Sequence, residues 1–199
     1  MRRWLLIAVR LRGPQLGTTP ADKNRMGLPR REVVFLFLVF LGTTQLLSAD
    51  PFPQRGPTIP GKTAQLRRGV ACAPEKAPLA VKRAIWAANQ LRSKPYRWGG
   101  GHRSFFDFGY DCSGTVSYAL AAAGVLRTPL SSNELTRFGS RGRGKWITVY
   151  ARNGHAFAVI AGLRLDTTAW NRRSDREAPR WQLTFRPLRG FEPRHPAGL

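Results

Sequence analysis

The chain has 199 residues, of which 33 are Lys or Arg and 11 are Asp or Glu, so its formal net charge is +22. Its hydrophobic fraction of 42% supplies the core of one domain rather than two. No internal repeat and no zinc-ligand spacing occurs in the sequence, which argues against a repeat protein and a zinc module. The charge indicates either a polyanionic partner or a compositional bias towards arginine. Because the basic residues are scattered along the chain, their distribution does not discriminate between these two explanations.

Residues 26–50 are typical of a targeting region. Arg30 and Arg31 precede an apolar run from Val33 to Leu41, and the small residues Ser48 and Ala49 follow. This pattern predicts a secretory signal, and the run is shorter than the ~20 residues of a membrane span. We therefore expect an exported protein, located outside the cell, in the cell wall or in the periplasm. The alternative for the segment is an uncleaved membrane anchor, which would be the protein's only membrane contact.

The sequence predicts four consecutive regions. Residues 1–25 are expected to be an upstream extension without fixed structure, because Met26 is the better start for a signal at 26–50. Residues 51–77 are rich in Pro, Gly, Arg and Lys and predict an extended linker. Residues 78–199 are expected to form the folded domain.

Helices come first in this domain and strands follow, which indicates an α+β fold. A helix is expected from Leu79 to about Leu91, with one apolar face, and Lys94-Pro95 ends it. Ser131 and Glu134 form a capping-box pattern that predicts a short helix. The β-branched and aromatic stretches predict strands at residues 146–150, 155–160, 163–168 and 181–185.

Asp111-Cys112 marks the start of a second helix, which runs through Ala123 to a stop at Gly124. A cysteine at this position lies at the positive end of the helix dipole, which favours a nucleophilic thiolate. A lone buried cysteine is more often a small hydrophobic residue. A disulfide with Cys72 is another alternative, and it would consume the nucleophile.

A thiolate nucleophile requires an imidazole to pair with it, and His155 is the best candidate. His155 opens a predicted strand that fixes its direction, whereas His102 lies in a glycine-rich loop and His195 near the C-terminus. A lone histidine on a strand is usually an ordinary half-buried residue. It is the combination of Cys112 with His155 that indicates catalysis.

Strand geometry predicts that Asp166 orients His155. If Ala161-Gly162 is a two-residue hairpin turn, Phe157 faces Asp166, and His155 lies diagonal to Asp166 on the same face of the sheet. The carboxylate would then fix the imidazole tautomer and support its charge. The alternative is that Asp166 pairs with Arg164 on a basic surface.

The arrangement resembles the NlpC-type cell-wall peptidases, a papain-like cysteine peptidase family. The residues that carry the resemblance are Tyr96-x-x-Gly99-Gly100, Asp111-Cys112-Ser113-Gly114 and Gly154-His155, in that order. The resemblance implies a papain-like fold with the nucleophile helix packed on a small antiparallel sheet. It also implies catalysis by Cys112 and His155 on peptidoglycan stem peptides, often at the bond between D-glutamate and a diamino acid. Tyr96, Asp111 and Ser113 would line the substrate side of the cleft.

The predicted reaction is acyl transfer to water and needs no metal or cofactor. A non-catalytic basic module that binds anionic polymers of the cell wall is the main rival. A nucleic-acid binder is disfavoured by the export signal and by the absence of a recognisable nucleic-acid motif. Within the enzymes, the same Cys–His pair could serve an amidase or an acyltransferase.

Overall fold

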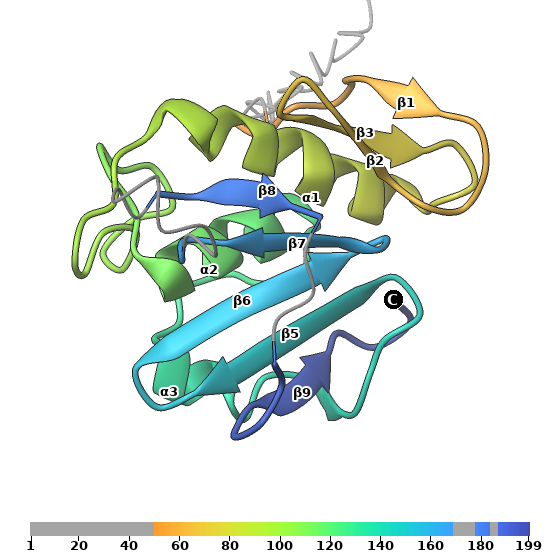
Figure 1. The fold of residues 1–199 in the computed structure, drawn as a ribbon. Helices are drawn as coiled ribbons and strands as arrows, with labels where there is room; N and C mark the ends of the chain where they lie inside the picture. Colours follow the sequence, from red (N-terminus) through yellow and green to blue (C-terminus); the bar gives the residue numbers. More distant parts are fainter. Residues whose placement is uncertain (1–49, 169–177, 184–186) are drawn as a thin grey trace, which may run out of the picture. The chain divides into compact units, whose positions relative to one another are not determined.

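The computed structural model describes residues 50–168, 178–183 and 187–199, and these residues form an α+β arrangement (Figure 1). The α-helices are α1 (Leu79–Gln90), α2 (Cys112–Ala122) and α3 (Ser132–Leu135), with a 3-10 turn at Leu91–Ser93. The strands are β1 (Thr58–Ile59), β2 (Gln65–Arg67), β3 (Val70–Pro74), β4 (Ser140–Arg141), β5 (Ile147–Arg152), β6 (His155–Ile160), β7 (Leu163–Asp166), β8 (Arg180–Gln182) and β9 (Glu192–His195).

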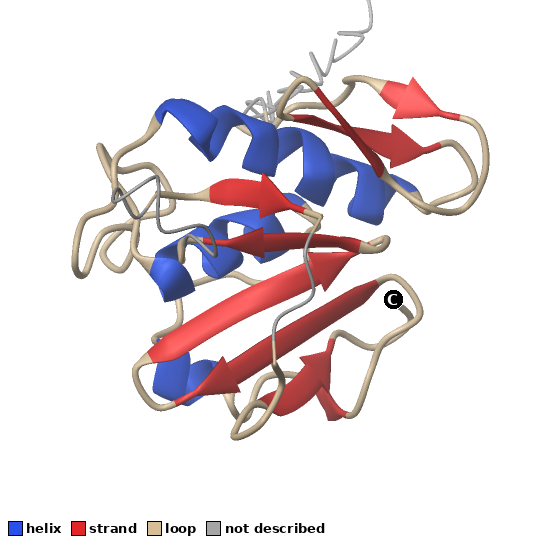
Figure 2. Cartoon of the chain, viewed as in Figure 1, coloured by secondary structure: helices blue, strands red, loops and turns tan. Residues whose placement is uncertain are grey.

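The main sheet has six strands in the order β4-β9-β5-β6-β7-β8, and neighbouring strands are antiparallel (Figure 2). Strands β5 to β8 overlap the four stretches that the sequence predicts, and β6 has the predicted bounds. β7 ends two residues earlier than expected, and part of the predicted strand at 181–185 lies outside the described residues. Strand β9 was not predicted from sequence, and it lies between β4 and β5.

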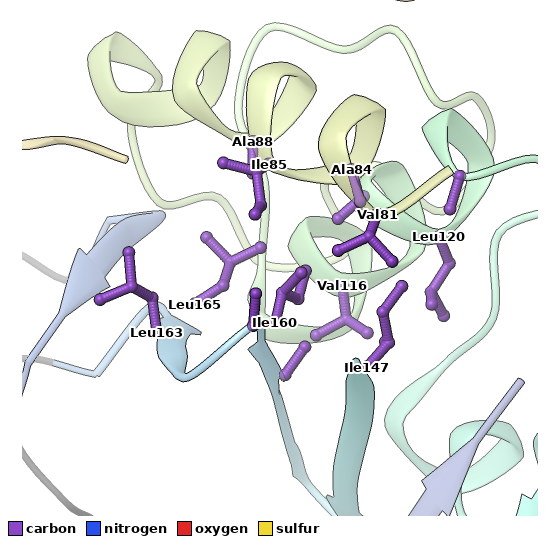
Figure 3. Close-up of a cluster of buried hydrophobic side chains, with 14 of the residues drawn as sticks. Val81, Ala84, Ile85, Ala88, Val116, Leu120, Ile147, Ile160, Leu163 and Leu165 are labelled. Atoms are coloured by element: carbon purple, nitrogen blue, oxygen red, sulfur yellow. The ribbon is translucent and has the colours of Figure 1, made fainter. Parts of the chain in front are cut away.

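Helices α1 and α2 bury their apolar side chains against one face of this sheet. Figure 3 shows the centre of this core, which is made by α1, α2, β5, β6 and β7 and includes Val81, Ile85, Val116, Leu120, Ile147, Ile160 and Leu165. The predicted apolar face of α1 is largely confirmed, but Leu79, at the first turn, is 57% exposed. All eleven residues of α2 are buried, so the helix that carries Cys112 is held on every side.

The segment predicted as an extended linker contains secondary structure. β1, β3 and β2 form a second small sheet, with β3 in the middle. The side chain of Asn89 on α1 accepts a hydrogen bond from Ala71 N–H and donates one to Ala71 C=O, both at 2.9 Å. Ala71 and Ala73 are fully buried, so β3 belongs to the core. The linker prediction was wrong for this segment because short strands of small residues carry little periodicity.

The predicted upstream extension and export segment lie outside the described residues, except for Asp50. Among the described residues, no helix has the length and hydrophobicity that a membrane span requires. The disulfide alternative is not observed, because Cys72 and Cys112 are both free thiols.

Candidate active site

The nucleophile candidate occupies the first position of α2. Asp111 is the N-cap, and its carboxylate accepts the Gly114 N–H at 2.8 Å, as predicted from sequence. Gly124 follows the helix with a φ of +76°, which confirms the predicted stop. The Cys112 side chain therefore lies among the free N–H groups of the first helical turn, where negative charge is stabilised. Cys112 is 7% exposed, so it is almost completely desolvated.

The glycines of the motif allow the loop before α2 to lie against the helix backbone. A Cβ on Gly114 would lie 2.1 Å from Gly100 O, and a Cβ on Gly100 would lie 2.3 Å from Gly109 O. Side chains at these positions would push the loop away from Cys112. Asp111 N–H also donates to Gly100 O at 3.2 Å, which ties the loop to the start of the helix.

The β6–β7 hairpin brings Asp166 to His155. Ile160 pairs with Leu163 and Ala158 with Leu165, which is the register predicted from sequence. His155 Nε2 lies 3.0 Å from Asp166 Oδ1. The same carboxylate oxygen accepts the Thr168 N–H at 3.0 Å, which fixes its position. The predicted proximity of the two side chains is therefore observed, and the role of Asp166 in catalysis stays a prediction.

The charge of His155 is set by its surroundings. Burial of the ring opposes its charge, but hydrogen bonds to Asp166 and to Cys112 outweigh burial and raise the pKa of His155 from 6.5 to about 9. Because Nε2 is bonded to Asp166, Nδ1 is the ring nitrogen left for the thiol of Cys112. The geometry thus favours an imidazolium at neutral pH, held between a carboxylate and a sulfur.

The raised pKa of His155 predicts a pH-dependent stability. Below pH 6.5 His155 is charged in both the folded and the unfolded chain, and its pair with Asp166 stabilises the fold fully. As the pH rises through about 9 the folded protein loses this proton, and the stabilisation is lost with it. We expect the difference in free energy of unfolding between wild type and His155→Gln to shrink between pH 6.5 and 9, measured by urea unfolding. A difference that stays constant over this range would contradict the assignment.

Asp166 also contacts Arg164, so the two alternatives raised by the sequence occur together. Arg164 Nε lies 3.5 Å from Asp166 Oδ2, and its Nη2 donates to Gln182 Oε1. Arg164 is 4% exposed and Asp166 is 1% exposed, so this is a buried ion pair. A buried guanidinium beside Asp166 favours the ionised carboxylate that His155 requires.

The predicted substrate-side residues gather around the same helix start. Asp111 and Ser113 flank Cys112 and are 5% and 2% exposed. Tyr96 forms an isolated parallel bridge with Tyr110, which places it alongside the chain that leads into Cys112. Among the described residues, no group of three or more His, Cys, Asp or Glu side chains is arranged as metal ligands.

The sequence did not assign one further residue of the site, His102. Its Nε2 lies 2.9 Å from both Asp111 Oδ2 and Ser113 Oγ. The signal in the sequence was its place directly after Gly99-Gly100-Gly101, in a loop that packs on α2. The third histidine, His195, is on β9, where its Nδ1 lies 3.1 Å from Gly142 O.

Comparison with family models shows which known proteins this part of the sequence is similar to. Residues 93–160 match the NlpC/P60 family. The resemblance seen in the sequence is thereby confirmed, and the matched segment contains Tyr96, Cys112 and His155. NlpC/P60 proteins are generally cysteine peptidases or hydrolases that act on peptidoglycan. No curated protein matches the chain. Asp166 lies beyond the segment that matches the NlpC/P60 model.

Proposed function

We propose that this protein is an exported, papain-like cysteine peptidase that hydrolyses amide bonds in peptidoglycan stem peptides. The observation that carries the proposal is the arrangement of three side chains in and beside the NlpC/P60 segment. Cys112 starts a buried helix, His155 is the charged partner of its thiol, and Asp166 binds the far side of the imidazole. A nucleophile, an acid–base group and an orienting carboxylate are the three parts that such a reaction needs.

Acylation begins when the Cys112 thiolate attacks the carbonyl carbon of the scissile amide and forms a C–S bond. The developing oxyanion is stabilised by N–H groups at the start of α2. His155, as the imidazolium, gives its proton to the leaving nitrogen while the C–N bond breaks. The amine product leaves, and the acyl group remains on Cys112 as a thioester.

Deacylation returns the enzyme to its starting state. His155, now neutral, removes a proton from water, and the oxygen attacks the thioester carbonyl. The C–S bond breaks, the Cys112 thiolate leaves, and the product carries a new carboxylic acid that loses its proton to solvent. His155 again holds the proton, and Asp166 stabilises the charge that this proton brings.

Within stem peptides, we propose the bond between D-glutamate and the diamino acid as the site of cleavage. The NlpC-type resemblance supports this choice, and Tyr96, Asp111 and Ser113 flank the nucleophile where the peptide would bind.

Export fits a substrate that lies outside the cytoplasm. If Met26 is the functional start, deleting residues 1–25 should leave secretion unchanged, and loss of secretion would contradict this part of the proposal.

Digestion of purified muropeptides tests the proposed function. The full chain should release the peptide fragments expected from cleavage after D-glutamate, identified by mass, and Cys112→Ala protein should release none. Release of a different fragment would support the assignment as a peptidase but show that another bond is cleaved. Salt-sensitive binding of wall polymers without any product would favour the non-catalytic wall-binding module instead.

A further inference from the structure

We propose that His102, with Arg97 and Arg103, forms a pocket beside Cys112 that binds a free carboxylate on the substrate. This inference rests on the proposed function and names a chemical feature of the peptide that the site accepts. The pocket is lined by Arg97, Trp98, Gly99, His102, Arg103, Ser104, Phe106 and Asp107. It lies next to the start of α2, because His102 contacts Asp111 and Ser113, the two residues on either side of Cys112 in the chain.

The Asp111 carboxylate lies on the substrate side, but all of its hydrogen-bonding capacity is used within the protein. Its Oδ1 accepts the Gly114 N–H at 2.8 Å and the Ser113 O–H at 3.0 Å. Its Oδ2 accepts the Gly99 N–H at 3.1 Å and lies 2.9 Å from His102 Nε2. Four donors fill the lone-pair positions of a carboxylate. A substrate ammonium group would have to displace one of these donors to reach Asp111.

His102 is the exposed member of this cluster. Its side chain is 34% exposed, whereas that of Asp111 is 7% exposed. With Nε2 held by Asp111 and Ser113, Nδ1 is the ring nitrogen available to a ligand. A bound carboxylate could accept a hydrogen bond from a protonated Nδ1, with the charges of Arg97 and Arg103 beside it.

The pocket also carries basic side chains. Arg97 and Arg103 are exposed, and the side chain of Arg97 is 64% exposed. The acidic residue of the lining, Asp107, accepts the N–H groups of Gly101 and Phe108, and these bonds lower its pKa. Arg97 Nη1 forms an ion pair with Asp107 Oδ1 at 3.7 Å, a distance too long for a hydrogen bond, so the N–H donors of Arg97 are not taken up by Asp107. Arg97 and Arg103 can therefore both donate hydrogen bonds to an anionic ligand.

One further acidic group, Glu134, lies near His102, and its carboxylate is already hydrogen-bonded within the protein. Glu134 accepts the N–H and O–H of Ser131 in the capping box of α3, at 2.7 and 2.6 Å. The rim of the pocket is aromatic, with Trp98 82% exposed and Phe106 53% exposed. A peptide fits this lining if its carboxylate faces the basic side chains and its methylene groups pack against the aromatic rim. In the proposed substrate, the α-carboxylate belongs to the same D-glutamyl residue as the scissile γ-amide, and the α-carbon and two methylene groups separate the two.

The test compares two stem peptides that differ only in this group, one with a free α-carboxylate and one with a carboxamide. Binding is measured by calorimetry on full-chain Cys112→Ala protein, so that neither peptide is consumed. We expect the carboxylate peptide to bind at least about tenfold more tightly, as a charge-assisted hydrogen bond predicts. His102→Gln should reduce this preference to less than about threefold.

Two more variants separate binding from folding, each made in the same Cys112→Ala protein. Arg103→Gln leaves every hydrogen bond to Asp111 in place, and it should also weaken the carboxylate peptide selectively. Arg127→Gln removes an exposed arginine beyond the other end of α2 and should leave both affinities unchanged. Equal affinities for the two peptides, a preference for the carboxamide, or no binding of either peptide would overturn the proposal. Hydrolysis by the wild type reports separately on the proposed function, which fails if neither peptide is cleaved.

Discussion

Hydrolysis of stem peptides is expected to fall to the uncatalysed background when Cys112 is replaced by alanine. The substitution removes the atom that forms the covalent bond, and none of the other groups of the site can take its place. Alanine is the best helix former, so α2 should retain its structure. The measurement is the rate of product release, with circular dichroism to check the fold.

Cys72 provides a matched control, because it is a free thiol with the same exposed fraction of 7%. Cys72→Ala should retain activity, since Cys72 lies on β3 and away from a helix N-terminus. A thiol alkylator at pH 6 should label Cys112 faster than Cys72, because only Cys112 has a charged imidazole beside it. Faster labelling of Cys72 would contradict the assignment of the nucleophile.

The second large effect is expected at Asp166. Asp166→Asn should lower turnover at least ~100-fold, because the imidazole loses the carboxylate that fixes its tautomer and supports its charge. Some loss of stability should accompany this change, since buried Arg164 loses its ionic partner. Asparagine is preferred to alanine here because it keeps the side-chain volume.

A pH profile separates the orienting role of Asp166 from a structural one. The alkaline limit of kcat/KM in the wild type should report the pKa of His155, about 9, and in Asp166→Asn it should move to lower pH. Asp50→Asn breaks a carboxylate–arginine pair with Arg83 outside the site and should leave both turnover and the profile unchanged. Normal turnover in Asp166→Asn would rule out the orienting role.

The sequence predicts those parts of the fold whose signals are local. The N-cap Asp111, the helix stop Gly124 and the capping box of Ser131 and Glu134 each act within one or two turns, and the structure confirms all three. The β6–β7 register also follows from local chemistry, because a two-residue turn fixes every later pair. Ala161 adopts a φ of +48° in this turn, so the turn forms even without glycine or asparagine at that position.

The parts that the sequence does not predict depend on contacts between distant segments. β9 contains Pro193, which argues against a strand inside a sheet, yet this strand pairs with β5 and β4. β3 is held by Asn89, 18 residues away, rather than by its own apolar pattern. His102 joins Asp111 and Ser113 only because the glycine loop folds back onto α2. None of these contacts leaves a periodic signal in the sequence.

Trapping the acyl-enzyme tests the central claim most directly. The protein is mixed with a stem peptide, quenched in acid within the first turnover, and analysed by intact mass and peptide mapping. The proposed mechanism predicts a thioester on Cys112, with the mass of the acyl part of the peptide, that disappears as product accumulates. Hydrolysis that proceeds without this adduct and survives Cys112→Ala would contradict it.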